Sequence, residues 1–203
     1  MEKRVFLVHG WEGRPDNHWF PWLSWELKAR GFEVYAITMP NPDEPKVSEW
    51  ISAIKSAVGR PTAETYFVGH SLGCIAIVRY IVQMPVKAKI GGCIFVAGFS
   101  GDLNIPEIAE FYLPPQTAAR GQNADRTRTD AEFFESAKQH CDKFVTIFSD
   151  NDECVPMARS LEFQKALGAK GILERGKGHF SKSEGVDALP SAFNELMIMS
   201  ALE

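Results

Sequence analysis

The stretch from Thr65 to Tyr80, which reads TYFVGHSLGCIAIVRY, limits the fold of this chain more than any other. An apolar, β-prone run at 66–68 meets the pentapeptide GHSLG at 69–73, and an apolar helical pattern follows at once. Small residues two places either side of a serine allow a turn tight enough to present the Ser71 hydroxyl at the edge of a sheet. The stretch predicts a strand, a sharp turn and a helix, with Ser71 as a candidate nucleophile. The pentapeptide alone also fits a serine that merely caps a helix.

Length and composition indicate one soluble domain that spans 1–203. The chain has 45% apolar and 24% charged residues, which is ordinary for a globular protein. Its net charge of −4 gives no electrostatic reason to expect nucleic acid or an anionic membrane as a partner. The first apolar run, Val5 to Val8, is too short for a signal peptide or a membrane span. Four cysteines without C-x-x-C spacing are expected as small buried residues in a reducing cytoplasm, with disulfides or metal binding as the alternative.

Strand and helix patterns alternate along the whole chain. Strands are expected at 4–9, 33–38, 66–68, 90–97, 143–149 and 171–174. Helices are expected from Asp16 or Asn17 to Arg30, after Ser71, and at 47–58, 103–113, 131–140, 157–167 and 189–202. The alternation predicts a three-layer α/β domain with a mostly parallel sheet of about six strands. The segment at 102–130, which includes a polar stretch at 117–129, is too short to build a large cap.

The order of three residues tests the interpretation of Ser71. In hydrolases with a serine at such a turn, an acid and then a histidine follow on loops after later strands. Asp152 follows the fifth expected strand and His179 follows the sixth. All three fall at C-terminal strand ends, which meet at one edge of a parallel sheet. We therefore predict Ser71, Asp152 and His179 as a catalytic triad, with Asp150 as the alternative acid.

Two backbone N–H groups are candidates for an oxyanion hole. One donor in such sites follows the nucleophile, and the other comes from the loop after an early strand. These positions are Leu72 and, in the glycine-rich loop after the first strand, Trp11.

Aromatic residues near the predicted edge are candidates for a substrate pocket. His18 and Trp19 lie close to the first loop, and Phe99 follows the fourth expected strand. Packing in the core is an equal alternative for His18 and Trp19. We expect Trp22 and Trp25 to pack in the core.

The sequence gives no support for a metal or a cofactor. The chain lacks H-E-x-x-H, a Cys/His cluster and the glycine-rich nucleotide-binding motifs. Structural roles are expected for His9, His70 and His140, and no resident metal or cofactor is expected.

The sequence resembles the small α/β-hydrolases related to the retinoblastoma-binding serine hydrolase, and is most similar to their compact bacterial members. The resemblance covers nearly the whole chain. It is carried by VHG at 8–10, NHWFPWL at 17–23, MPNP at 39–42, GHSLGC at 69–74, SDNDECVP at 149–156 and GHF at 178–180.

The resemblance implies a minimal α/β-hydrolase fold without a large cap and the same triad. It also implies cleavage of an ester or an amide. We expect a small-molecule acyl substrate as the partner, and the charge and the short apolar run give no reason to expect nucleic acid or a membrane. The mammalian relative's L-x-C-x-E motif for binding the retinoblastoma protein is missing from this sequence, so that partner is not carried over. One alternative function is that of a hydrolase-fold protein which mainly binds a partner, and another is that of a lyase or acyltransferase on the same fold. The sequence does not indicate an oligomeric state.

Overall fold

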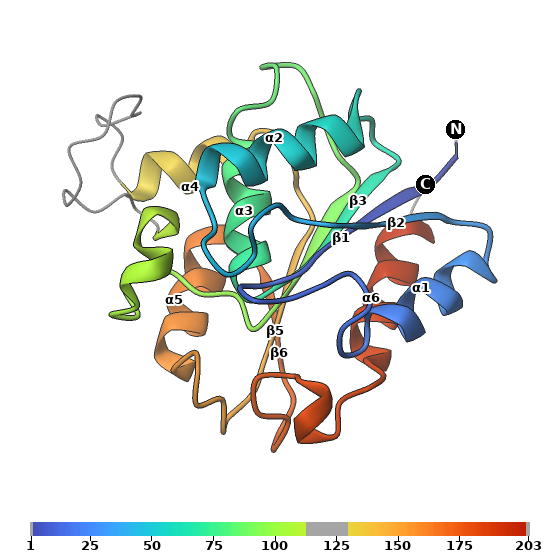
Figure 1. Ribbon diagram of the computed structural model, residues 1–203. Helices are drawn as coiled ribbons and strands as arrows, with labels where there is room; N and C mark the ends of the chain where they lie inside the picture. The colour runs from blue at the N-terminus through green and yellow to red at the C-terminus, as the bar shows by residue number, and fades with distance from the viewer. Residues whose placement is uncertain (1, 113–129, 202–203) are drawn as a thin grey trace.

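A computed structural model describes residues 2–112 and 130–201 of the chain. Its centre is one parallel sheet with the strand order β2-β1-β3-β4-β5-β6 (Figure 1). The strands are β1 (Arg4–Val8), β2 (Glu33–Ile37), β3 (Thr65–His70), β4 (Gly92–Val96), β5 (Phe144–Phe148) and β6 (Lys170–Leu173). The six expected strands are therefore present, and every neighbouring pair is parallel. The polar stretch at 117–129 lies outside the described residues.

Helices cover both faces of the sheet, as Figure 1 shows. One face carries α1 and α6, and the other carries α2, α3, α4 and α5. Their bounds are α1 (Phe20–Lys28), α2 (Val47–Val58), α3 (Leu72–Ile81), α4 (Asp130–Lys138), α5 (Met157–Leu167) and α6 (Pro190–Ala201). Two 3-10 helices are η1 (Pro106–Phe111) and η2 (Lys182–Glu184). The predicted three-layer fold of an α/β hydrolase is confirmed.

The apolar runs of the central strands follow from burial on both faces. Successive side chains of a strand point to opposite faces of its sheet. In β1, Val5 and Leu7 join the core beneath α1 and α6, whereas Phe6 and Val8 join the core beneath α2 and α3. A strand covered on both sides needs an apolar residue at every position, so its sequence is a continuous apolar run.

The first helix differs from its prediction. It begins at Phe20, because the chain before it forms a turn in which His18 has a positive φ of 55°. The expectation that Trp25 packs in the core is wrong, since 66% of this residue is exposed. The buried residues of α1 are Phe20, Leu23 and Leu27, which share one helix face at spacings of three, four and seven. Trp25 lies off that face.

The four cysteines do not share one environment. Cys74, Cys93 and Cys141 are free and buried, as expected of small core residues. Cys154 is free but exposed, on the loop between β5 and α5, so the expectation of burial is wrong for this residue. Across the described ranges, no helix has both the length and the apolar character needed to cross a membrane.

The start of α3 lies very close to the end of β1. A Cβ atom placed on Gly73 would lie 2.2 Å from the Val8 carbonyl oxygen and 2.6 Å from that of His9. Both are main-chain atoms of a buried strand end, which cannot move without distorting the sheet. Only glycine allows this approach, and it fixes the position of the turn that carries Ser71.

Gly73→Ala is therefore expected to lower the free energy of unfolding by about 3 kcal/mol or more, the upper range for overpacking. Urea denaturation followed by tryptophan fluorescence measures the loss. Gly31→Ala is the matched control, because Gly31 has a positive φ but open space around its Cα. It should cost about 1 kcal/mol through backbone strain alone. Equal losses in the two variants would contradict the steric explanation.

Candidate functional site

Ser71 lies between β3 and α3 in a strained turn. Its φ of 52° and ψ of −121° are rare for a residue with a side chain, and such a conformation costs about 1–3 kcal/mol. Main-chain hydrogen bonds hold it there: Ser71 N–H donates to Val96 O at 2.8 Å, and Cys74 N–H donates to Ser71 O at 3.0 Å. A Cβ on Gly69 would approach the Cys74 nitrogen to 2.9 Å. The glycines of the pentapeptide thus allow strand and helix to pack against each other around Ser71.

Asp152 and His179 are brought together at the same edge of the sheet. His179 Nδ1 lies 2.8 Å from Asp152 Oδ2 and 3.1 Å from Oδ1. The carboxylate accepts, so Nδ1 carries the proton and Nε2 of the neutral ring keeps its lone pair. The Asp152 side chain is 3% exposed and that of His179 is 17% exposed. This arrangement suits a histidine that accepts a proton from a neighbouring group.

The loop after β5 separates the two candidate acids. Asp152 Oδ1 also accepts the N–H groups of Cys154, at 2.9 Å, and Val155, at 2.8 Å. Asp150 instead accepts Gly176 N–H at 2.9 Å and pairs with Arg175 at 3.4 Å. The structure therefore brings Asp152 onto the His179 ring and uses Asp150 to hold the loop that precedes His179.

His70 connects the turn at Ser71, here called the serine turn, to the loop after β6 that carries His179, here called the histidine loop. Its Nε2 donates to the His179 carbonyl oxygen at 2.8 Å, and the centroids of the two rings are 4.9 Å apart. Because His70 directly precedes Ser71, these contacts bring the serine turn and His179 together. Among the described residues, the Ser71 hydroxyl makes no hydrogen bond to His179. Catalytic hydrogen bonds often form only when substrate binds.

The two candidate oxyanion donors lie beside Ser71. Leu72 is the first residue of α3, where the helix dipole is positive. Trp11 directly follows Gly10, whose added Cβ would lie 3.0 Å from Ser71 Cβ. In the turns and loops that the structure describes, neither Trp11 N–H nor Leu72 N–H donates to a backbone carbonyl. Both therefore stay candidates for an oxyanion hole.

Glu184 is a residue of the site that the sequence reasoning missed. Its Oε1 accepts His179 N–H at 2.9 Å, and its Oε2 accepts Ser181 N–H at 3.0 Å and Ser181 Oγ–H at 2.7 Å. Burial acts to raise the pKa of the Glu184 carboxyl, but the hydrogen bonds from Ser181 and His179 outweigh it and lower that pKa. The sequence does contain a signal for the local role of Glu184, because S-x-x-E at 181–184 is the pattern of a capping box.

His70, His18 and His9 all have pKa values below the usual value of a histidine. Burial, and then the positive charge that His179 can carry, hold the pKa of His70 well below its usual value. The same two causes lower the pKa of His18, whose Nδ1 accepts Lys182 N–H at 3.0 Å and whose ring lies 5.4 Å from that of His70. Burial also lowers the pKa of His9, and its Nε2 accepts Met39 N–H at 3.1 Å. Each of these rings makes a hydrogen bond to the backbone of another segment, so they help to position the loops.

The predicted pocket residues divide into two groups. Trp19 and Phe99 are 0% and 1% exposed, and their rings pack in the two cores on opposite faces of the sheet. Packing accounts for both, and nothing in their burial supports an open pocket wall. His18 is half-buried beside the histidine cluster and stays a candidate wall. Trp11 is also half-buried, and its Nε1 donates to Asp43 O at 3.1 Å.

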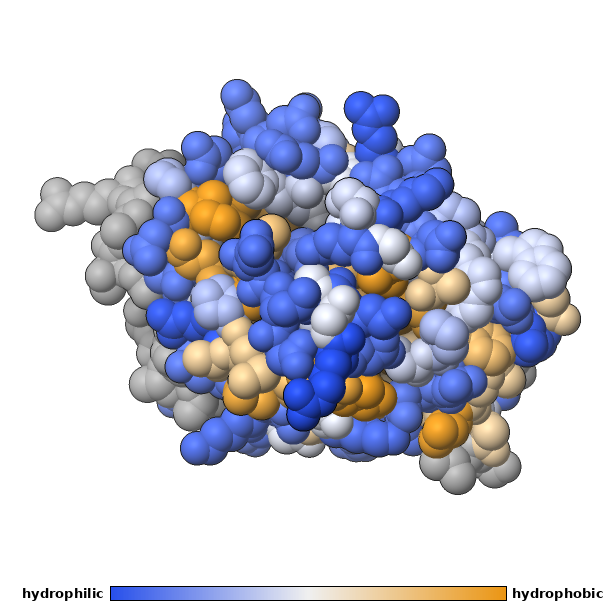
Figure 2. Space-filling view, turned by 90° about the horizontal axis from the view of Figure 1, so that it is seen from below, coloured by the Kyte–Doolittle hydropathy of each residue, from blue (hydrophilic) through white to orange (hydrophobic). Residues whose placement is uncertain are grey.

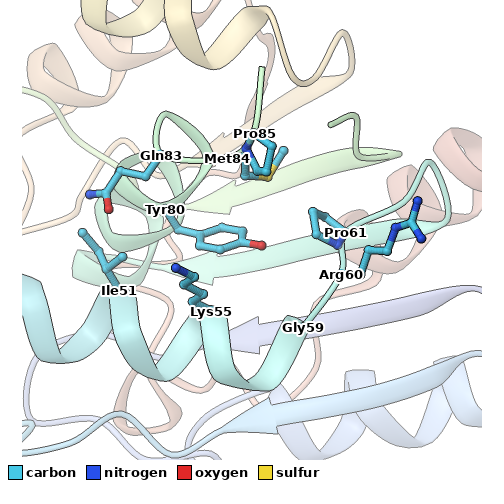
Figure 3. A pocket seen from close by; sticks show the side chains of 9 residues that line it. All are labelled: Ile51, Lys55, Gly59, Arg60, Pro61, Tyr80, Gln83, Met84 and Pro85. Atoms are coloured by element: carbon cyan, nitrogen blue, oxygen red, sulfur yellow. The ribbon is translucent and has the colours of Figure 1, made fainter. Parts of the chain in front are cut away.

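The loops after β5 and β6, which carry Asp152 and His179, lie at the bottom of Figure 1. Figure 2 looks onto this edge and shows hydrophilic side chains interspersed with smaller hydrophobic patches. A separate pocket of about 290 Å³ lies at the C-terminal ends of α2 and α3, by the opposite edge of the sheet (Figure 3). Tyr80, Met84, Lys55 and Arg60 are among its lining residues. None of the predicted site residues lines it.

Comparison of the sequence with known families gives a match over most of its length. A family model described as serine hydrolase matches residues 5–197. The protein YdeN of Bacillus subtilis is 30% identical over 196 residues, which cover 97% of this chain and 95% of YdeN. The serine hydrolase RBBP9 of Rattus norvegicus is 26% identical over 170 residues, which cover 82% of this chain and 80% of RBBP9.

Solved structures agree with these relatives. The crystal structure of the ydeN gene product from B. subtilis has a TM-score of 0.83 and 28% identity, and the match covers 98% of this chain and 99% of that one. Est1E from Butyrivibrio proteoclasticus has a TM-score of 0.67 at 15% identity, covering 98% of this chain and 89% of Est1E. At that identity the second likeness concerns the fold alone.

The buried neutral His70 gives a testable dependence of stability on pH. In the unfolded chain a histidine gains its proton near pH 6.5, whereas folded His70 does so only at lower pH. Between these values the unfolded state binds more protons, so the free energy of unfolding falls as pH decreases below about 6.5. Each such histidine contributes up to about 1.4 kcal/mol per pH unit.

His70→Asn is expected to reduce this slope, since its amide can still donate to His179 O without titrating. Urea denaturation of both proteins between pH 7 and pH 5 measures the difference. Identical slopes for wild type and His70→Asn would contradict a neutral His70.

Proposed function

The chain belongs to the serine hydrolase family, and we propose that it cleaves a small ester, or a small amide, through an acyl-enzyme at Ser71. The observation that carries the proposal is the hydrogen bond of 2.8 Å from His179 Nδ1 to the buried Asp152 carboxylate, at the sheet edge that carries Ser71. It leaves the lone pair of Nε2 as the base of the site.

The first half-reaction begins with proton transfer from Ser71. A serine hydroxyl is a poor nucleophile at neutral pH and needs an adjacent base. In the proposal, His179 Nε2 takes the Ser71 proton as Oγ bonds to the substrate carbonyl carbon, and Asp152 stabilises the imidazolium. The N–H groups of Trp11 and Leu72 donate to the oxyanion. His179 then gives the proton to the leaving alcohol or amine, and the acyl group stays on Ser71.

The second half-reaction repeats these roles with water. His179 Nε2 removes a proton from water as its oxygen attacks the acyl carbonyl, and the proton returns to Ser71 Oγ when the carboxylic acid leaves. His70 and Glu184 act as positioning residues, because they hold the His179 carbonyl and N–H groups at 2.8 Å and 2.9 Å. The histidine loop is thereby fixed on both sides of the reacting ring.

A small substrate is proposed because of the connection that follows β4. Its described part contains η1, a 3-10 helix of six residues. Arg79 of α3 fastens it, donating to the carbonyl oxygens of Glu110, Phe111 and Tyr112 at 2.8–3.2 Å. Within the described residues, this short element tied to α3 supports a small acyl group over a long chain.

Turnover of short-chain p-nitrophenyl esters tests the proposal. Ser71→Ala and His179→Ala are each expected to lower kcat by at least about 10⁴-fold, because each removes a member of one proton-transfer unit. Asp152→Asn should cost about 10⁴-fold by favouring the wrong tautomer of His179.

Asp150→Asn is the matched control for the acid, since Asp150 contacts the backbone of the same loop but not the histidine ring. We expect it to lower kcat by less than about tenfold, allowing for its hydrogen bond to the loop. Equal turnover in wild type and Ser71→Ala would reject the enzyme function and favour a partner-binding role. A greater loss in Asp150→Asn than in Asp152→Asn would reject Asp152 as the acid.

A further inference from the structure

We propose that Asp152, Cys154 and His179 form a binding site for a thiophilic divalent cation such as Zn²⁺, and that cation binding switches the site off. A carboxylate oxygen of Asp152, the Cys154 Sγ and a ring nitrogen of His179 all lie within 4.8 Å of one another. Two loops supply these atoms, one after β5 and one after β6. The binding part stands on this geometry alone, whereas the inhibition rests on the proposed function.

The spacing of the three atoms is close to what a tetrahedral cation needs. Zinc bonds of 2.0–2.3 Å place neighbouring ligand atoms roughly 3.5 Å apart. The distance that remains is at most about 1.3 Å, and in the proposal the exposed Cys154 side chain closes it by rotation. Cys154 is exposed, and in the described structure its sulfur makes no hydrogen bond, unlike that of Cys74 or Cys141. Its side chain is therefore free to turn toward the other two ligands.

The donor types select the class of cation. Sulfur, imidazole nitrogen and carboxylate oxygen are the ligands that Zn²⁺ takes in proteins, and three protein ligands with one water make a common coordination set. Magnesium and calcium prefer oxygen atoms alone. Since Cys154 is exposed, solvent can reach the site and supply the fourth ligand.

The local charge also favours a cation. The carboxylates of Glu153 and Glu184 lie close enough to act on the Cys154 sulfur electrostatically, in addition to Asp152. Arg175, on the loop that also carries His179, is paired with Asp150. The sequence did not indicate a metal because the ligands are spread over two loops without a recognisable spacing.

Cation binding would remove the base from the site. The proton on His179 Nδ1 would move to Nε2, and the lone pair that this frees on Nδ1 would bind the metal. Cys154 would lose its thiol proton to solvent and bind as the thiolate. The neutral ring then carries N–H at Nε2, where it would have to accept the Ser71 proton. The metal and the hydrogen bond to Asp152 compete for the same atom, His179 Nδ1. The cation would therefore inhibit without covering Ser71.

Cobalt(II) tests the binding step without any turnover. In the Ser71→Ala protein we expect Co²⁺ to give a thiolate-to-cobalt charge-transfer absorption. Adding Cys154→Ser should abolish this band while leaving the fold intact, because the backbone N–H that Asp152 accepts is kept. Glu153→Gln is the matched control, since it removes a neighbouring charge but no ligand, and its band should remain. The proposal would be overturned if the Ser71→Ala protein showed no band, or if the band persisted after Cys154→Ser was added to it.

Zinc inhibition of ester turnover tests the consequence. The Zn²⁺ concentration for half-inhibition should rise at least about tenfold in Cys154→Ser, the scale of losing one ligand contact, with uninhibited turnover unchanged. Equal inhibition of wild type and Cys154→Ser by Zn²⁺ would overturn the proposal that the cation switches the site off. If the cobalt band forms but wild type hydrolyses no ester, the metal site stands and the proposed function fails.

Discussion

The close approach of the first turn of α3 to the end of β1 is the contact on which the rest of the site depends. Gly73 lies against the carbonyl oxygens of Val8 and His9, where a methyl group would overlap them. That approach positions Ser71 in its strained conformation and places the loop containing Trp11 beside it. Both candidate oxyanion donors are therefore set by backbone packing in the middle of a rigid parallel sheet.

The histidine loop is held in a different way, through polar contacts. Side chains after β5 bind its backbone: Asp150 accepts Gly176 N–H, and Asn151 Oδ1 accepts Gly178 N–H at 2.8 Å. His70 and Glu184 then hold the two main-chain groups of His179. Because each contact is made to the backbone, both ring nitrogens of His179 stay available, Nδ1 to Asp152 and Nε2 to the Ser71 proton in the proposed reaction. The same polar network leaves Cys154 exposed beside the histidine.

Sequence patterns were sufficient for the features set by local periodicity and chain order. The continuous apolar strands, the turn at Ser71 and the alternation of elements predicted the layers of the fold, and the order Ser71, Asp152, His179 predicted which loops meet. Individual side chains were harder. The positive φ of His18 directs Trp19 into the core, and no pattern reveals such a conformation in a residue other than glycine. The exposure of Trp25 could have been predicted from its position off the apolar face of α1, and the role of Glu184 from the capping-box pattern. Both signals compete with simpler interpretations, a buried aromatic residue and a solvated charge.

The central claim is that Ser71 is activated by His179 in the folded protein. Labelling with a fluorophosphonate, which needs an activated serine but little substrate recognition, followed by peptide mass spectrometry, tests it most directly. The account predicts rapid modification of Ser71 in wild type and a large loss of labelling in His179→Ala. Unmodified Ser71 in folded wild type, or equal labelling of the two proteins, would contradict it.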